Sequence, residues 1–189
     1  MTGVQTCALP ISLTARSDPA AQPFAKAFRE RLGALARAHE YVRPHSPDSA
    51  PPVAGQTVLG LMRLIMAAYE ENGRARVVIS GDDAEIGERT ATALALIMHE
   101  QATNAVKYGG LSRNGGQVAL TGCRRDDRYT LTWSETGGPE VAEPPVRKGF
   151  GTILAERSVA GQLDGVLEHD WAPGGLVMRL DVPVQNLRH

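Results

Sequence analysis

Apolar residues recur with the spacing of helices along much of the chain, and elsewhere they alternate with polar residues as in strands. Helical spacing predicts helices over residues 18–43, 57–69, 86–108 and 150–160. Short apolar or alternating runs predict strands over residues 76–80, 116–121, 128–134, 163–170 and 176–182. After a helical preface, the order is strand, helix, two strands, helix and two strands. This order predicts an α+β sandwich, in which one sheet carries helices on one face.

The helix predicted over residues 18–43 carries a near-heptad stripe. Steps of three and four residues connect its members, which are Phe24, Phe28, Leu32, Leu35, His39 and Val42. Such a stripe is typical of a face that packs against another helix, so we interpret His39 as a packing residue. A proline-rich segment over residues 44–52 then predicts a linker.

The helix predicted over residues 86–108 has a chemically distinctive polar face. Glu100, Asn104 and Lys107 lie at positions i, i+4 and i+7 and therefore share one face. The opposite face is apolar and comprises Leu94, Met98, Ala102 and Ala105. Carboxylate and amide oxygens are hard ligands suited to Mg²⁺, and the ammonium group balances a phosphate. The face fits a magnesium and phosphate site, although an ordinary amphipathic surface helix gives the same pattern.

Two glycine-containing segments follow further along the chain. Glu135 lies at the end of a predicted strand, just before Gly137 and Gly138. Its carboxylate can accept a hydrogen bond from an exocyclic amine, and the glycines let a flat ring approach the backbone closely. Residues 149–151, Gly-Phe-Gly, open a helix whose free N–H groups attract phosphate. Taken singly, the first segment also fits a plain turn and the second a plain helix start.

Together these segments resemble the sensor histidine kinases. The N box matches His99, Glu100, Asn104, Lys107 and Tyr108; the G1 box matches Glu135, Gly137 and Gly138; the G2 box matches Gly149, Phe150 and Gly151. The N-box histidine with Trp133-x-Glu135 is the signature of the HWE subfamily, and residues 31–39 resemble its dimerisation segment. The resemblance covers residues 13–184. Departures from the usual pattern are Gln101 in place of an apolar residue and Gly110 in place of alanine.

The resemblance implies a Bergerat-type ATP site on a mixed sheet, with ATP and Mg²⁺ as cofactors. It implies that Asn104 ligates Mg²⁺, that Glu100 orients a metal-bound water or polarises the attacking histidine, and that Glu135 accepts from the adenine amine. The further nucleotide-binding residues that it implies are Lys107, Tyr108, Gly137, Gly138, Gly149, Phe150 and Gly151. The implied reaction moves the ATP γ-phosphate to a histidine and then to a response-regulator aspartate, in a cytoplasmic homodimer.

The expected domain organisation has three parts. Residues 1–12 resemble the translation of a sequencing adapter and are expected to be non-native, with a short signal peptide as the alternative. Residues 13–48 are expected to be a remnant of the dimerisation and phosphoacceptor region, and residues 49–189 the ATP-binding catalytic domain. The phosphoacceptor histidine is expected upstream of residue 1. We interpret the remaining histidines as surface residues: His45, His169 and His189.

Composition narrows the remaining function classes. A net charge of −1 over 189 residues gives no electrostatic argument for binding nucleic acid or an anionic membrane. The sequence has no apolar run long enough for a transmembrane segment. Cys7 and Cys123 lie far apart without metal-type spacing, so neither a disulfide framework nor structural zinc is expected. Two alternatives stay open: an ATP-binding regulatory module without kinase activity, and a serine kinase of the same superfamily.

Overall fold

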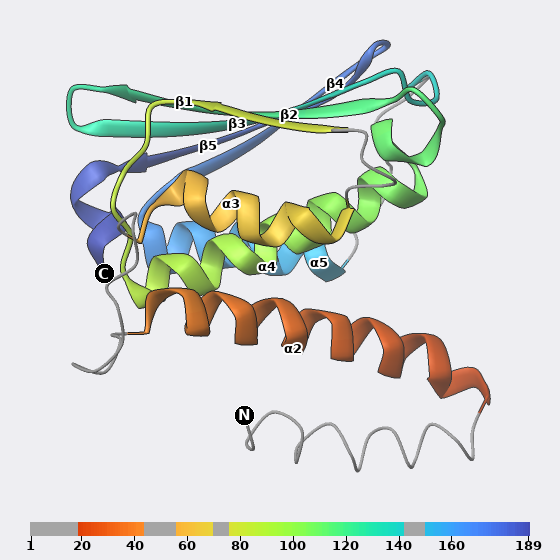
Figure 1. Cartoon of the computed structure of the whole chain (residues 1–189), viewed down its shortest axis with the longest axis horizontal. Coiled ribbons are helices and arrows are strands. Elements are labelled where there is room, and N and C mark those ends of the chain that lie inside the picture. Colours follow the sequence, from red (N-terminus) through yellow and green to blue (C-terminus); the bar gives the residue numbers. More distant parts are fainter. Residues whose placement is uncertain (1–18, 44–55, 70–75, 142–149) are drawn as a thin grey trace.

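The computed structural model describes residues 19–43, 56–69, 76–141 and 150–189. In this part of the chain a five-stranded sheet lies above a layer of helices that cover one of its faces (Figure 1). The strands are β1 (Val77–Gly81), β2 (Gln117–Arg125), β3 (Arg128–Thr136), β4 (Val166–Ala172) and β5 (Gly175–Pro183). The predicted α+β fold with helices on one face is confirmed.

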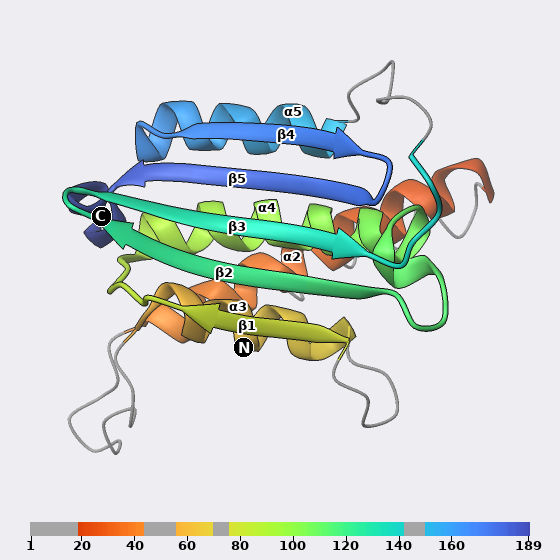
Figure 2. The same cartoon turned by 90° about the horizontal axis from the view of Figure 1, so that it is seen from above.

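The sheet has the strand order β1-β2-β3-β5-β4 (Figure 2). β1 pairs with β2 in parallel and all other pairs are antiparallel, so the sheet is mixed. β2 and β3 join in a tight hairpin in which Arg125 pairs with Arg128. Asp126 in this turn has a φ of 52°, a left-handed conformation that aspartate tolerates better than most residues. The hairpin carries β2 beyond its predicted end, because pairing continues to the turn.

Three helices form the layer beneath the sheet. α4 (Glu88–Lys107) contacts both α3 (Val58–Met66) and α5 (Phe150–Ser158). α3 continues as a 3-10 turn over Ala67–Tyr69, and α5 as a π-helical segment over Val159–Leu163. α3 begins at Thr57, whose Oγ1 accepts from the Gly60 N–H at 3.2 Å and caps the helix. Shorter 3-10 helices are Pro19–Ala21, Gly110–Ser112 and Val184–Arg188.

The hydrophobic core lies between the sheet and these helices. α4 faces the core with the four residues expected on its apolar side, all of them buried: Leu94, Met98, Ala102 and Ala105. The sheet contributes large side chains that are equally buried, among them Leu120, Leu131, Trp133 and Met178. The predicted division of α4 into an apolar face and a polar face is therefore confirmed.

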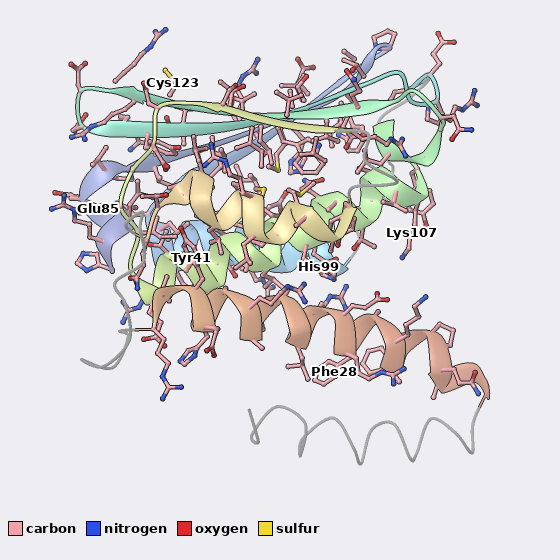
Figure 3. All side chains as sticks on the ribbon, viewed as in Figure 1. Phe28, Tyr41, Glu85, His99, Lys107 and Cys123 are labelled. Carbon is pink, nitrogen blue, oxygen red and sulfur yellow. The ribbon has the colours of Figure 1, made fainter. Side chains whose placement is uncertain are left out.

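α2 (Gln22–Val42) forms a third layer on the side of α4 away from the sheet (Figure 1). Its buried residues are Ala25, Ala34, Ala38 and Val42. Small side chains at these positions allow α2 to approach α4 closely. The aromatic end of the predicted stripe does not face α4: Phe24 is exposed and stacks on Phe28, which points away from α4 in Figure 3.

The interpretation of His39 as a packing residue was wrong. Its side chain is mostly exposed, and its Nε2 lies 3.2 Å from Oε1 of Glu88 at the start of α4. The exposed position of His189 agrees with the prediction, whereas His45 lies outside the described residues. Among the helices of the described part, none has the length and apolar character needed to cross a membrane.

Candidate functional site

A cavity of about 720 Å³ lies between the C-terminal half of α4, α5 and strands β3, β4 and β5. Four of the predicted site residues line it: Asn104, Tyr108, Glu135 and Gly138. The other lining residues are Gln101, Gly109, Gly110, Pro139, Val141, Thr152, Glu156, Leu167, His169, Trp171, Gly175 and Leu176. Segments far apart in the sequence therefore meet at one concave site that combines apolar walls with a few polar groups, as ligand pockets do.

Glu135 is a buried carboxylate in the wall of this cavity, with an exposed fraction of 5%. Its Oε1 accepts from the indole Nε1 of Trp133 at 2.9 Å, and its Oε2 accepts from the backbone N–H of Gly110 at 2.6 Å. These two donors fix the carboxylate in place. Each oxygen still has a second lone pair, so the group can accept from a ligand as well.

Glycines surround Glu135 because no side chain fits there. A Cβ on Gly109 would overlap Oε2 of Glu135, and a Cβ on Gly175 would overlap the Glu135 carbonyl oxygen. Gly137 has a φ of 69°, in the left-handed region that favours glycine, and it follows directly after β3. A Cβ on Gly138 would lie 2.8 Å from the carbonyl carbon of Gly109, so the two chain segments touch at this point.

The three polar residues predicted to share a face all lie on α4, but they differ in surroundings. Asn104 is exposed at the cavity, together with Tyr108 just beyond the helix. Lys107 is exposed in the last turn of α4 and does not line the cavity (Figure 3). Glu100 also lies outside the lining. Of the three residues, Asn104 therefore lines the cavity, whereas the charged residues Glu100 and Lys107 do not.

Glu100 is instead paired with Arg31 of α2. The guanidinium Nε donates to Oε1 at 2.5 Å and Nη2 donates to Oε2 at 3.0 Å. The pair is partly buried, with side-chain exposed fractions of 22% for Arg31 and 13% for Glu100. The hydrogen bond that Arg31 donates to Glu100, together with the negative charge of Glu100, raises the pKa of Arg31 against the opposing effect of burial. Nothing in the sequence pattern had linked these two residues.

Comparison with known proteins agrees with this architecture. A profile of the family described as HWE histidine kinase matches residues 7–83. The chain is 40% identical over 177 residues to Blue-light-activated histidine kinase 1 of Erythrobacter litoralis. The aligned region covers 92% of this chain and 48% of that relative. The chain belongs to the HWE family of histidine kinases.

Other relatives of this HWE kinase chain point the same way. It is 32% identical over 161 residues to a blue-light-activated histidine kinase of Brucella ovis, covering 83% of the chain and 32% of that relative. The chain thus spans about half the length of the first relative and about a third of the second.

Solved structures show the same fold. The histidine kinase domain of an Erythrobacter litoralis blue-light activated kinase matches with a TM-score of 0.66 at 19% identity, covering 96% of this chain and 84% of that one. The catalytic domain of the histidine kinase ThkA matches with a TM-score of 0.50 at 16% identity, covering 69% and 97%. The five-stranded sheet with its helices is therefore the fold of histidine kinase catalytic domains.

The signature residues of the HWE family have defined structural positions in this chain. Trp133 is buried and holds Glu135 through the indole hydrogen bond. His99 is a buried residue of α4, with its Nδ1 3.0 Å from the hydroxyl of Tyr69. Burial lowers the pKa of His99 and raises the pKa of Tyr69, so both are neutral at pH 7. The histidine ties α4 to the end of α3 and does not line the cavity.

The structure of this HWE kinase also corrects the interpretation of His169. We expected a surface residue, but His169 is half-buried, lines the cavity and has its Nε2 3.0 Å from Nε2 of Gln101. The alternation along β4 was the missed signal: Leu167, His169 and Trp171 are more buried than the residues between them. Since alternate residues of a strand share one face, the histidine belongs to the cavity side.

The predicted G2 residues are only partly within the described chain. Gly149 lies outside it, whereas Phe150 and Gly151 form the first residues of α5. Two later residues of this helix, Thr152 and Glu156, line the cavity. The helix start predicted for phosphate binding is thus adjacent to the cavity wall, and the roles of residues 149–151 stay predictions.

Proposed function

We propose that this chain is the ATP-binding catalytic region of a two-component sensor histidine kinase. In this proposal the cavity binds ATP with Mg²⁺, and the γ-phosphate passes to a histidine and then to a response-regulator aspartate. The observation that carries the proposal is the buried Glu135 carboxylate in the cavity wall, held by Trp133 and Gly110. Family membership supplies the reaction class.

Glu135 provides the base contact. A fixed carboxylate accepts a hydrogen bond from the exocyclic amine of adenine, and a charge-assisted bond of this kind is stronger than a neutral one. The glycines at positions 109, 110 and 175 also line the cavity and add no side chain beside the carboxylate. The apolar walls, which include Leu167, Trp171 and Leu176, suit the faces of such a ring.

Asn104 provides the metal contact. Its amide oxygen is a hard ligand exposed at the cavity, and Mg²⁺ in kinases is held by few protein ligands, with phosphates and water completing its shell. Within the described ranges no group of three or more acidic, histidine or cysteine side chains forms a separate metal cage. When bound, the ion neutralises charge that develops on the transferring phosphate. Lys107 and Tyr108 add a cation and a hydroxyl beside the phosphates or ribose.

In this proposal Glu100 polarises the attacking histidine. Both of its carboxylate oxygens accept from Arg31, and its side chain does not line the cavity. Each oxygen keeps a second lone pair for the histidine, but the guanidinium neutralises the charge with which Glu100 would act on it, so the pair weakens this role. The same contact is the observation that favours the alternative, an ATP-binding regulatory module in which Glu100 serves only to hold α2.

The proposed domain organisation places the acceptor outside the catalytic domain. Residues 13–48 would belong to the dimerisation region, and residues 49–189 would be the catalytic domain of a cytoplasmic homodimer. A receiver domain is the proposed partner. In support, a solved complex of the histidine kinase ThkA with the response regulator TrrA contains a chain of the same fold, with a TM-score of 0.52 at 14% identity.

Phosphate transfer to a supplied acceptor tests the proposal. The chain is mixed with MgATP labelled at the γ-phosphate and with the separate dimerisation and acceptor domain of a related HWE kinase. We expect label on the acceptor that is lost in acid and kept in base, as a phosphohistidine behaves. Label that survives acid would indicate the serine kinase alternative. Binding of ATP without any transfer would indicate the regulatory module.

A further inference from the structure

We propose that Gln101 and His169 form a second polar contact for the nucleotide base, across the cavity from Glu135. In this arrangement the two contacts together set which base the cavity accepts. The inference rests on the proposed function, because it assumes that the cavity holds a nucleotide. Neither residue has a part in the account of phosphoryl transfer given above.

The sheet register places Trp133, Met178 and His169 in one row on the face of the sheet that forms the bottom, or floor, of the cavity. Met178 of β5 pairs with Trp133 of β3 on one side and with His169 of β4 on the other. Paired residues point to the same face of a sheet, so the three side chains form a row beneath the helices. Two strand spacings separate Trp133 from His169, about 10 Å. Glu135 lies two residues beyond Trp133 on the same face, so the carboxylate and the imidazole stand on opposite sides of the cavity floor.

Gln101 reaches this row from above. It is a buried residue of α4, and its Nε2 lies 3.0 Å from Nε2 of His169 and 3.0 Å from the sulfur of Met178. The ring of His169 stacks on Trp171, with centroids 6.4 Å apart and planes 12° apart. The orientation of the polar pair is thus fixed by contacts with both the helix and the sheet.

Gln101 is buried and His169 is half-buried, so folding removes part of the hydration of this polar pair. Amide and imidazole groups lose hydration when they are buried, and a thioether sulfur is only a weak acceptor in return. Replacing both members of a buried polar pair by apolar groups of similar shape is often neutral or stabilising. The rest of the helix-facing row, Trp133 and Met178, is fully buried. Because Gln101 and His169 both line the cavity, a ligand contact explains why they are polar.

Base selectivity needs such a second contact. The exocyclic amines of adenine, guanine and cytosine can all donate to a carboxylate, so Glu135 by itself does not select adenine. An amide and an imidazole each offer donor and acceptor atoms. Their placement opposite Glu135 fixes the orientation of the ring. A base with a different arrangement of donors and acceptors on the edge away from Glu135 leaves a polar group of the protein unpaired. Sites built in this way reject the wrong ligand strongly.

The test measures selectivity on the whole chain. A fluorescent ATP analogue is bound with Mg²⁺ and displaced by ATP, GTP or CTP. The double variant Gln101→Leu/His169→Leu removes both polar groups and leaves no orphaned partner. We expect its affinity for ATP to fall about tenfold, the loss of one or two hydrogen bonds, and its preference for ATP over GTP to fall by a similar factor. The matched control is His39→Leu, the same change at an exposed histidine outside the cavity, which should alter neither value.

Two results would overturn the inference, and they are distinguishable. Wild-type chain that binds none of the three nucleotides rejects the proposed function and this inference with it. Wild-type chain that prefers ATP, with an unchanged preference in the double variant, rejects this inference alone. Should the double variant not fold, Gln101→Glu keeps the size of the side chain but replaces the amide donor by an oxygen. It should also shift the ratio of ATP to GTP affinity, and an unshifted ratio again rejects the inference.

Discussion

Arg31 on α2 holds both carboxylate oxygens of Glu100 on α4, at 2.5 Å and 3.0 Å. The two residues are 69 positions apart in the chain, and their contact joins the outer helix layer to the helix that carries the candidate site. Glu100 therefore has a structural role, as the partner of Arg31 on α2, besides its proposed role of polarising the attacking histidine. The two roles lead to separate predictions.

Arg31→Met should destabilise the fold, because it leaves the partly buried Glu100 without its cation. We expect the free energy of unfolding to fall by about 1–3 kcal/mol. Lys26→Met is the matched control, since Lys26 and Glu30 form an exposed pair at 3.9 Å with side-chain exposed fractions of 73% and 45%. That change should cost less than about 0.5 kcal/mol. Urea denaturation measures both, and equal losses would show that the Arg31 pair contributes no more than a surface pair.

The same Arg31→Met variant should transfer phosphate faster to a supplied histidine acceptor, because a guanidinium no longer neutralises the charge of Glu100. Glu100→Gln should transfer more slowly, because it removes the charge that polarises the histidine. Initial rates at saturating MgATP compare the two variants with wild type. A slower rate for Arg31→Met at unchanged ATP affinity would mean that Arg31 positions Glu100 for the reaction.

Gly109→Ala should weaken ATP binding, since its new Cβ overlaps Oε2 of Glu135 and displaces the carboxylate. Overpacking of this kind typically costs about 1–3 kcal/mol in stability as well. Gly174→Ala, in the turn between β4 and β5, is the control because a Cβ there meets no atom within 4 Å. Calorimetric titration with MgATP should show a loss of affinity in the first variant only. Equal affinities would mean that the position of Glu135 is irrelevant to binding.

Stability should fall in mild acid through His99. Its burial lowers the pKa below the ordinary value of 6.5. Between the folded pKa and pH 6.5, the imidazole is therefore protonated in the unfolded chain and neutral in the folded chain. The stabilising effect of the neutral ring is fully present above pH 6.5 and is lost as the pH falls from 6.5 toward the folded pKa. His99→Gln should reduce the loss of unfolding free energy between pH 7.5 and 5.5. Identical pH dependence in wild type and His99→Gln would contradict the assignment.

Much of the fold was predictable because its elements have strong periodic patterns. α4 combines a continuous apolar face with a polar one, and the helix lies within two residues of its expected bounds. The strands alternate clearly, and their turns carry Asp, Pro and Gly residues. Spacing placed Glu100, Asn104 and Lys107 on one helix face, and the structure brings Asn104 to the same cavity as Glu135.

The remaining features depend on tertiary contacts that periodicity does not encode. α2 packs on α4 through alanines such as Ala34 and Ala38, which a search for large apolar residues passes over. The Arg31–Glu100 pair joins distant segments. His169 was assigned to the surface because it lies at the end of a predicted strand, although its place in the alternation of β4 put it on the cavity side.

The most direct measurement is calorimetric titration of MgATP into the wild-type chain and into Glu135→Ala. The account predicts that the wild type binds one equivalent. It predicts that Glu135→Ala loses about 1.5–3 kcal/mol of binding free energy, the range for a hydrogen bond to a charged group. Glu135→Gln, which keeps an acceptor oxygen, should lose less. Equal affinities in wild type and Glu135→Ala, with both chains folded, would contradict the placement of the nucleotide in this cavity.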